Sequence, residues 1–485
     1  MLIISLAVLL HSAVVSAASQ PLPFEDCALT GNGGATRVAA ECATLSVPLD
    51  VSTPGAAEIK LRVVRMRSLA PEPAADAFTL VNGGPGGSSI SLFADLAPML
   101  TPILRERDII ILDQRGTGDS TPLACPALEE ETVTEFDPET TARLAAECAR
   151  ALPADPRYFT TSSAVRDLDL VRSLLGYEQL TLYGVSYGTR VVAHYARIYP
   201  EQTRGLIIDG VVPLDMALGP QISENAQQIL DSIFARCAGA PSCEAAFPAL
   251  PQTFTALSAQ LKVKPPTLSL PHPTTGETAS LTLSYAHLAV AIRLMTYAPE
   301  TAALIPLLIS QAAREKNYVP LAAQALRITD QLTDALSYGM HNAVVCTEDV
   351  PHYDFDPQAR ADSLASTFLG GEQLASLVAI CEQWPQGFID PDFHAPLQTD
   401  LPTLLLSGEF DPITPPANAE QALATLSNAR HLIAPGQGHG VIARGCVPNL
   451  LSQFIEDLDV DALDASCLDR LGPEPFFVDL MGPAR

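Results

Sequence analysis

The sequence predicts an α/β protein in which a mostly parallel sheet is flanked by helices and interrupted by a large, mainly helical insertion. Short, nearly continuous apolar runs such as 108–112 are typical of central strands of a parallel sheet, because such strands are buried on both faces. Strand and helix patterns alternate up to residue 213 and again from residue 397. Between them, residues 214–396 are mostly helical in pattern, which predicts a cap over the carboxyl ends of the strands.

The chain of 485 residues therefore divides into four segments, and no internal repeat is evident in it. The two core segments are expected to form one sheet, because the strand–helix rhythm resumes after the cap. We expect a signal peptide at 1–18, the first part of the α/β core at 19–213, the helical cap at 214–396, and the second part of the core with a C-terminal extension at 397–485.

The first core segment carries alternating strand and helix signals. Two antiparallel strands are predicted between about Ala43 and Arg67, where the pattern alternates. The stretch 121–161 is rich in loop signals. Further strands are expected at 78–81, 108–114, 180–184 and 205–210, and helices at 163–176 and 191–200.

The cap segment has apolar residues at helical spacing, and we expect most of these to form ordinary core. Helices are predicted at 222–237, 285–295, 320–336 and 371–384, with one hairpin at 266–284. After the cap we expect a strand within 402–411, a helix near 419–426 and a strand within 429–440.

Composition and charge limit the function classes. Hydrophobic residues make up 47% of the chain and charged residues 17%, which fits a globular protein and argues against disorder. Acidic residues outnumber basic ones 55 to 28, for a net charge of −27. A field of this sign repels nucleic acid and anionic membranes and draws in a cationic ligand weakly. We expect no nucleic-acid partner and no stable membrane association of the mature chain; the oligomeric state is not predicted.

An apolar run opens the chain. The run from Leu2 to Leu10 is followed by the small residues Ser16, Ala17 and Ala18, a pattern typical of a secretory signal cleaved near Ala17 or Ala18. Neither Lys nor Arg precedes the run, which leaves an uncleaved anchor as the alternative. We expect a periplasmic or secreted protein.

The cysteines agree with export. There are ten of them, an even number, as expected for disulfides formed in an oxidising compartment. A zinc site is the alternative, but the chain has no CxxC pair and no clustered Cys/His spacing, and we expect no metal. Connectivity does not follow from sequence alone; pairing each cysteine with its neighbour would join Cys27–Cys42, Cys125–Cys148, Cys237–Cys243, Cys346–Cys381 and Cys446–Cys467.

One short motif indicates a nucleophile. Residues 184–188 read G-V-S-Y-G, the only G-x-S-x-G match, between an expected strand and an expected helix. A nucleophile on a tight strand-to-helix turn has an exposed hydroxyl, and only glycine beside it lets the chain pass closely enough. We predict that Ser186 is the catalytic nucleophile; the alternative is a glycine-rich turn with a buried serine.

A serine hydroxyl needs a base that is oriented by an acid, and the expected chain order is serine, acid, histidine. Asp411 follows a late apolar strand, and His439 follows the last one between glycines. The competitors are Glu409 for the acid and His431 for the base, although His431 lies within an expected strand. We predict Asp411 and His439, and only geometry can exclude Glu409.

The oxyanion of an acyl-transfer reaction needs two backbone N–H donors. We predict one from Tyr187, which follows the nucleophile, and one from the loop N-G-G-P-G-G-S-S at 82–89, where we choose Gly84. A phosphate-binding loop is excluded, because no G-x-x-x-x-G-K-[ST] pattern occurs.

In chain order, NGGPGGSS (82–89), DQRGTGDS (113–120), GVSYGT (184–189), GEFDPITP (408–415) and GQGHG (436–440) resemble the proline iminopeptidase and tripeptidyl aminopeptidase group of α/β-hydrolases, peptidase family S33 with a TAP-like C-terminal region. The resemblance extends from about Ala43 to Cys446 and implies the α/β-hydrolase fold. The group commonly has His where this chain has Asn82, which can still hold the loop by hydrogen bonds. We expect Asp113 and Arg115 to brace the oxyanion loop as structural partners.

The same resemblance suggests residues that bind substrate. The segment V-V-C-T-E-D at 344–349 resembles the part of the group that supplies carboxylates to the substrate amine, which makes Glu348 and Asp349 the candidates. The alternative is a pair of solvated acids. The segment C-E-Q-W-P at 381–385 also resembles tripeptidyl-type members, and its Trp384 either lines the pocket or packs in the cap core.

These features predict an exported serine aminopeptidase that cleaves N-terminal residues or short peptides through an acyl-enzyme, without a cofactor. The first alternative is a carboxylesterase acting on small acyl esters with the same three residues. The second is a non-catalytic binding protein on a hydrolase scaffold. The sequence does not predict how many residues would be released.

Overall fold

The computed structural model describes residues 22–484, except 33, 35, 51, 54, 127 and 129–136. The predicted signal peptide at 1–18 lies outside the described residues. None of the helices within the described part is long and apolar enough to span a membrane.

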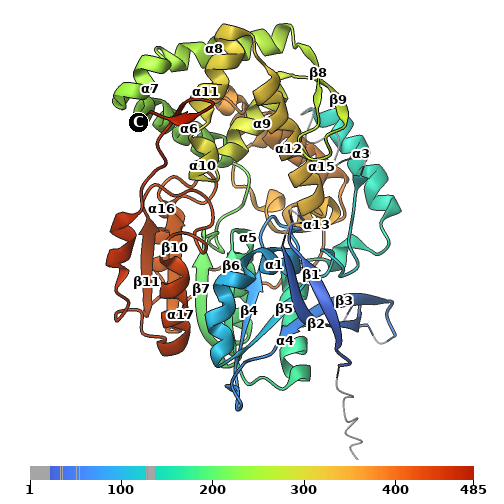
Figure 1. Ribbon diagram of the computed structural model, residues 1–485. Helices are drawn as coiled ribbons and strands as arrows, with labels where there is room; N and C mark the ends of the chain where they lie inside the picture. The colour runs from blue at the N-terminus through green and yellow to red at the C-terminus, as the bar shows by residue number, and fades with distance from the viewer. Residues whose placement is uncertain are drawn as a thin grey trace, which may run out of the picture.

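A nine-stranded sheet forms the base of the molecule (Figure 1). Five of its eight pairings are parallel, as predicted for a mostly parallel sheet, and the three antiparallel ones lie at its N-terminal end. In spatial order the strands are β1 (Glu25–Thr30), β2 (Arg37–Pro48), β3 (Glu58–Met66), β5 (Asp108–Leu112), β4 (Ala77–Val81), β6 (Leu180–Val185), β7 (Thr203–Asp209), β10 (Thr403–Gly408) and β11 (Ala429–Ala434).

The central strands are apolar because helices cover both faces of the sheet. Every residue of β4 and β10 is buried. One face packs against α1 (Ser89–Leu100) and α17 (Val447–Asp457). The other face packs against α4 (Thr161–Leu175), α5 (Tyr187–Ile198) and α16 (Pro416–Leu423). The fold is therefore an α/β/α sandwich, and the sequence-based prediction of fold class is confirmed.

The helices of residues 214–396 gather above the carboxyl ends of the strands, in the upper half of Figure 1. They enclose an apolar cluster of their own that includes Leu230, Leu288 and Leu308. The helices are α6 (Ile222–Gly239), α7 (Pro241–Ala246), α8 (Leu250–Val263), α9 (Tyr285–Met295), α10 (Pro299–Ala302), α11 (Ile305–Ser310), α12 (Val319–Ala335), α13 (Tyr338–Glu348), α14 (Pro357–Ser363) and α15 (Glu372–Gln383), with a hairpin of β8 (Thr267–Pro271) and β9 (Thr278–Thr282).

Several elements were not predicted, among them α1, α8, α13 and α17, and three others change the outline of the fold. The edge strand β1 pairs with β2, and the stretch read as loop contains α3 (Pro138–Ala151), which packs against α15. Asp137 caps α3 by accepting from the N–H of Thr140, with proline at the first helical position, a start signal that the surrounding loop residues obscured. The C-terminal extension crosses to the cap, where Phe476 joins the cap cluster and β12 (Phe477–Asp479) lies beside α11 (Figure 1).

All ten cysteines form disulfides between neighbours in the sequence. Of the connectivities that the sequence left open, the structure has the sequence-near one throughout. The Cys125–Cys148 bond ties α3 to the segment before it, and the Cys346–Cys381 bond joins α13 to α15.

Candidate active site

Ser186 lies at the turn between β6 and α5, with φ 57° and ψ −128°. A non-glycine residue with positive φ is strained and persists where the surrounding structure holds it. A Cβ on Gly184 would lie 2.3 Å from the Gly188 oxygen, and a Cβ on Gly188 would lie 2.3 Å from the Val81 oxygen. Both flanking glycines are therefore required by close backbone approach, which is the physical content of the G-x-S-x-G pattern.

The structure brings Asp411 and His439 together. The Oδ2 atom of Asp411 lies 2.8 Å from His439 Nδ1. The Asp411 carboxylate is buried and accepts from the N–H groups of Ile413 and Thr414 at 2.9 Å and from the Thr414 hydroxyl at 2.8 Å, which fixes its orientation. Burial disfavours a charged imidazole, but the charge of Asp411 and its hydrogen bond outweigh this effect, so the pKa of His439 is raised.

The two competing residues have other partners. Glu409 accepts a hydrogen bond from the N–H of Gly436 at 2.7 Å, and so braces the loop that leads to the histidine. His431, in β11, contacts the Ser407 hydroxyl at 2.9 Å and the Glu420 carboxylate at 2.5 Å. Of the two carboxylates, Asp411 is therefore the one that bonds His439.

Asp209, at the end of β7, ties the nucleophile turn to the histidine loop and was not singled out from the sequence. Its carbonyl accepts from the N–H of Ser186 at 2.9 Å. Its buried carboxylate accepts from the N–H groups of Val441 and Ile442, at 2.8 and 2.9 Å, and from the Tyr183 hydroxyl at 2.9 Å. Burial raises the pKa of Asp209 to about 6. The signal in the sequence that could have pointed to Asp209 is its position as an aspartate at the end of an apolar central strand.

The glycine loop after β4 lies against Ser186. A Cβ on Gly83 would come within 3.2 Å of Ser186 Oγ. The Gly83 N–H donates to Asn82 Oδ1 at 2.7 Å, and Asn82 Nδ2 donates to the Ser88 carbonyl at 3.0 Å, so the asparagine holds the loop. Gly84 has φ +116°. Tyr187 is the first residue of α5, where a backbone N–H has no acceptor within the helix.

The D-Q-R-G-T-G-D-S segment supports this loop from behind. Asp113 accepts from the Ser88 hydroxyl at 2.8 Å and from the N–H of Ile90 at 3.0 Å, which holds the start of α1. The expectation that Arg115 braces the loop is wrong: it forms a buried ion pair with Asp167 on α4, at 2.7 Å, and donates to the Leu49 and Tyr158 carbonyls. None of these bonds is made to Ser186.

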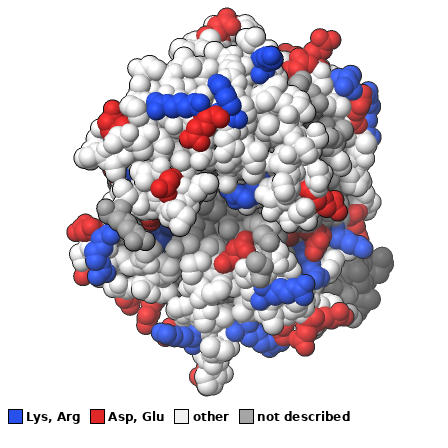
Figure 2. All heavy atoms as spheres, turned by 45° about the horizontal axis from the view of Figure 1, so that its top comes forward, with Lys and Arg blue, Asp and Glu red and all other residues white. Residues whose placement is uncertain are grey.

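Cap residues contact the glycine loop on one side and the loop that carries His439 on the other. The N–H of Ser337 donates to the Gly86 carbonyl at 3.0 Å, and His341 Nδ1 lies 3.3 Å from the Pro85 carbonyl. From the other direction, the N–H of His439 donates to the Tyr297 carbonyl at 2.9 Å, and the two rings lie 5.2 Å apart, edge to face. Figure 2 shows a hollow in the middle of the face turned toward the viewer, with basic side-chain atoms inside it and acidic groups at its rim.

Glu348 and Asp349 lie in a fully buried network, not among solvated acids. Glu348 accepts from the Thr161 N–H at 2.7 Å and from its hydroxyl at 2.8 Å. Asp349 pairs with Arg190 on α5 at 2.9 Å, and its Oδ2 atom has no hydrogen-bond partner among the described residues. Burial raises the pKa of Glu348 to about 7 and raises that of Asp349, against the lowering effect of Arg190.

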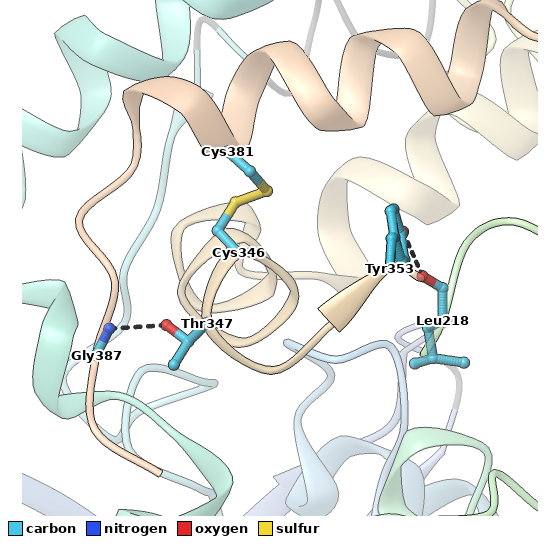
Figure 3. The surroundings of a disulfide bond; sticks show 6 residues. All are labelled: Leu218, Cys346, Thr347, Tyr353, Cys381 and Gly387. Carbon is cyan, nitrogen blue, oxygen red and sulfur yellow. Dashed lines mark hydrogen bonds between the residues drawn. A yellow bond between two sulfur atoms is a disulfide. The ribbon is translucent and has the colours of Figure 1, made fainter. Parts of the chain in front are cut away.

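The segment around these acids is fastened to its neighbours, as Figure 3 shows. Beyond the Cys346–Cys381 bond, the Gly387 N–H donates to the Thr347 hydroxyl at 2.9 Å, and the Tyr353 hydroxyl donates to the Leu218 carbonyl at 2.6 Å. Trp384 is 4% exposed and packs in the apolar cluster around this disulfide. That position fits the packing alternative for the tryptophan.

Replacing Gly84 by alanine is expected to lower kcat by about 10²- to 10³-fold, the effect of losing one oxyanion donor. The new Cβ would lie 2.8 Å from Leu336 Cδ2 and 3.0 Å from the Gly86 nitrogen, at a φ that side chains rarely adopt. The measurement is kcat and KM, determined on a substrate that the wild type cleaves rapidly. Gly34→Ala is the control, because that glycine also has positive φ but nothing lies within 4 Å of its would-be Cβ. Equal kcat in both variants would contradict the role of Gly84.

Two family models match the chain. A model described as "TAP-like protein" matches residues 366–467, and one described as "alpha/beta hydrolase fold" matches residues 76–240. The tripeptidyl aminopeptidase of Streptomyces lividans is 29% identical over 221 residues, which cover 41% of this chain and 40% of that protein. The match thus spans about two fifths of that relative's length. Serine protease Hip1 of Mycobacterium bovis is 25% identical over 475 residues, covering 90% of this chain and 89% of Hip1.

The chain has the α/β-hydrolase fold, with a TAP-like region at residues 366–467. Carboxylesterase B of Mycobacterium tuberculosis is 31% identical to this hydrolase over 227 residues, covering 42% of the chain and 43% of the esterase. Among solved structures, proline iminopeptidase of Mycobacterium smegmatis has a TM-score of 0.38 at 15% identity, over 87% of this chain and 100% of that one. Within the described part of the hydrolase, His, Cys, Asp and Glu side chains form no group of three that could hold a metal ion.

Proposed function

We propose that this chain is an exported serine hydrolase that removes N-terminal residues or short peptides from peptide substrates through an acyl-enzyme. The observation that supports it most is the arrangement at one edge of the sheet: Ser186 on a strained turn, the bonded pair of Asp411 and His439, and a glycine loop in contact with the serine. These are the parts that acyl transfer requires.

In the proposed cycle, Ser186 Oγ attacks the substrate carbonyl while His439 Nε2 takes the hydroxyl proton. Asp411 accepts from His439 Nδ1–H, which sets the tautomer and stabilises the imidazolium. The N–H groups of Tyr187 and Gly84 stabilise the oxyanion. His439 then gives the proton to the leaving amine, and water, activated by the same imidazole, hydrolyses the ester that remains on Ser186.

The peptidase assignment is supported by the relatives named tripeptidyl aminopeptidase and serine protease. Of the two acids proposed to bind the substrate amine, Asp349 has the oxygen without a partner, whereas both oxygens of Glu348 accept from Thr161. We therefore favour Asp349 for the ammonium, because a buried carboxylate oxygen without a donor is unfavourable until it is paired. Export is supported by the five disulfides.

The alternative is a carboxylesterase for small acyl esters, which the similarity to carboxylesterase B favours. The chemistry at Ser186 is the same for both, and only the leaving group and the amine contact differ.

A matched substrate panel separates the two functions. We expect free-amine aminoacyl and tripeptidyl amides to be cleaved roughly 10- to 100-fold faster, in kcat/KM, than their N-acetylated forms, because acetylation removes the charged donor to Asp349. Asp349→Asn should abolish this preference, and Glu348→Gln should keep it. Since loss of one partner of a buried pair also destabilises the fold, the readout is the ratio between paired substrates, which a purely structural effect does not change.

A short acyl ester completes the panel. Turnover of the ester alone would replace the peptidase assignment by the esterase one. An equal loss on free-amine amides, acetylated amides and ester in Asp349→Asn would remove the amine-binding role.

A further inference from the structure

Arg293 lies on α9, one helical turn before the cap segment that contacts the relay histidine. That segment is fixed, because the Tyr297 carbonyl accepts from the N–H of His439 and a Cβ on Gly438 would lie 2.3 Å from the same carbonyl. The Arg293 guanidinium reaches Tyr297, with Nη2 3.5 Å from the hydroxyl. Arg293 is thus a cap cation placed beside the catalytic edge.

Among the described residues, Arg293 has no carboxylate partner, and its buried Nε has no hydrogen-bond acceptor. Several other buried or half-buried arginines pair with carboxylates: Arg115 with Asp167, Arg190 with Asp349, Arg166 with Asp390 and Arg360 with Glu224. Others donate to backbone carbonyls instead, as Arg197, Arg236 and Arg430 do. In a chain with 55 acidic and 28 basic residues, acids are abundant. A guanidinium whose buried Nε has no acceptor is costly and calls for an explanation.

The charge of Arg293 acts on both walls of the site. Burial lowers the pKa of His341, beside the oxyanion loop, and the charge of Arg293 adds to that lowering. The same charge opposes the raised pKa of His439, in the catalytic pair. The guanidinium therefore lies within electrostatic reach of His341, which contacts the glycine loop, and of His439, which pairs with Asp411.

We propose that Arg293 binds a carboxylate of the substrate near the scissile bond, so that the enzyme prefers substrates that carry a negative charge there. A guanidinium offers a planar fork of N–H donors that fits a carboxylate with two parallel bonds. The carboxylate is either the C-terminal group of a short peptide or an acidic side chain next to the cleaved bond. This inference rests on the proposed function of Ser186.

The first test uses the rate at which phosphonates inactivate the full-length mature enzyme by reaction with Ser186. Two phosphonates are compared, identical except that one carries a carboxylate and the other a carboxamide near phosphorus. We expect the carboxylate form to react roughly 10- to 100-fold faster with the wild type. Arg293→Gln should remove the difference, and Arg293→Lys, which keeps the charge but not the fork, should restore part of it.

The matched control is Arg327→Gln, since Arg327 lies on the cap helix α12 and bonds the side chains of Gln324 and Gln331. It removes the same charge from the cap and should leave the preference intact. Peptide pairs then identify the carboxylate: free C-terminus against C-terminal amide, and Glu against Gln on each side of the cleaved bond. A preference in the first pair assigns the C-terminal group, and one in the second assigns the side chain.

The outcomes are distinct. Rapid labelling of Ser186 by both phosphonates at equal rates, unchanged in Arg293→Gln, would overturn the role of Arg293 and leave the proposed function standing. If Arg293→Gln and Arg327→Gln lose the preference equally, the preference comes from the total charge of the cap, and the specific role of Arg293 is overturned. Failure of either phosphonate to label Ser186 would overturn the proposed function and this inference together.

Discussion

Ser186→Ala is expected to lower kcat/KM by about 10⁶-fold on every substrate that the wild type cleaves. The hydroxyl oxygen forms the bond of the acyl-enzyme, and without it the histidine and the acid have no serine nucleophile to activate. His439→Ala should cost about as much, and the double variant little more, because the residues act as a unit. The measurement is kcat/KM on an amide and on an ester, together with labelling by a fluorescent phosphonate.

The chain supplies a sharp control for this experiment. Ser162, His194 and Asp390 form a second set of serine, histidine and aspartate in contact, with His194 Nε2 2.9 Å from Asp390 and 3.4 Å from Ser162. Ser162 is fully buried in the first turn of α4 and has no positive φ, so it lacks the strained turn on which Ser186 lies. Ser162→Ala should keep activity and labelling. Phosphonate attached to Ser162 in the wild type would contradict the assignment of the nucleophile.

The sheet and the nucleophile turn could be predicted because their determinants are local. Buried parallel strands are apolar along their whole length, and the glycines at 184 and 188 are required by contacts of the turn and its adjacent strand. Likewise, glycines flank His439, and one ends the strand before Asp411. Patterns of this kind can be recognised without knowing what lies opposite in space.

The remaining features depend on partners far away in the chain. The sequence does not distinguish Glu409 from Asp411 as the acid. Their contacts do: Glu409 accepts from the N–H of Gly436, and Asp411 bonds His439. The burial of Glu348 depends on Thr161, 187 positions away. Asp209 and Arg293 were overlooked for the same reason, since a polar residue at the end of a strand or on a helix is uninformative until its contacts, or their absence, are known.

Asp411→Asn is expected to lower kcat by about 10⁴-fold while leaving KM nearly unchanged. An amide at this position can donate to His439 Nδ1 and so favour the wrong tautomer, and it cannot stabilise the imidazolium. Glu409→Gln is the matched control, two residues away and equally conservative. It weakens one hydrogen bond to the N–H of Gly436 and should cost less than about tenfold, since a loop contact of this kind contributes roughly 1 kcal/mol.

The pH profile distinguishes an electrostatic role of Asp411 from a merely structural one. The base must be neutral, so activity falls as pH drops through the pKa of His439, which in the wild type is raised above its ordinary value of about 6.5. Asp411 raises that pKa by charge and hydrogen bond, and burial lowers it. Without the carboxylate, nothing at this contact opposes the lowering of the His439 pKa by burial. The acid limb of the kcat/KM profile should therefore move to lower pH in Asp411→Asn. In Glu409→Gln it should stay in place. If the acid limb does not move in Asp411→Asn, or moves equally in Asp411→Asn and Glu409→Gln, then Asp411 only holds the loop. In that case other groups stabilise the charge on His439.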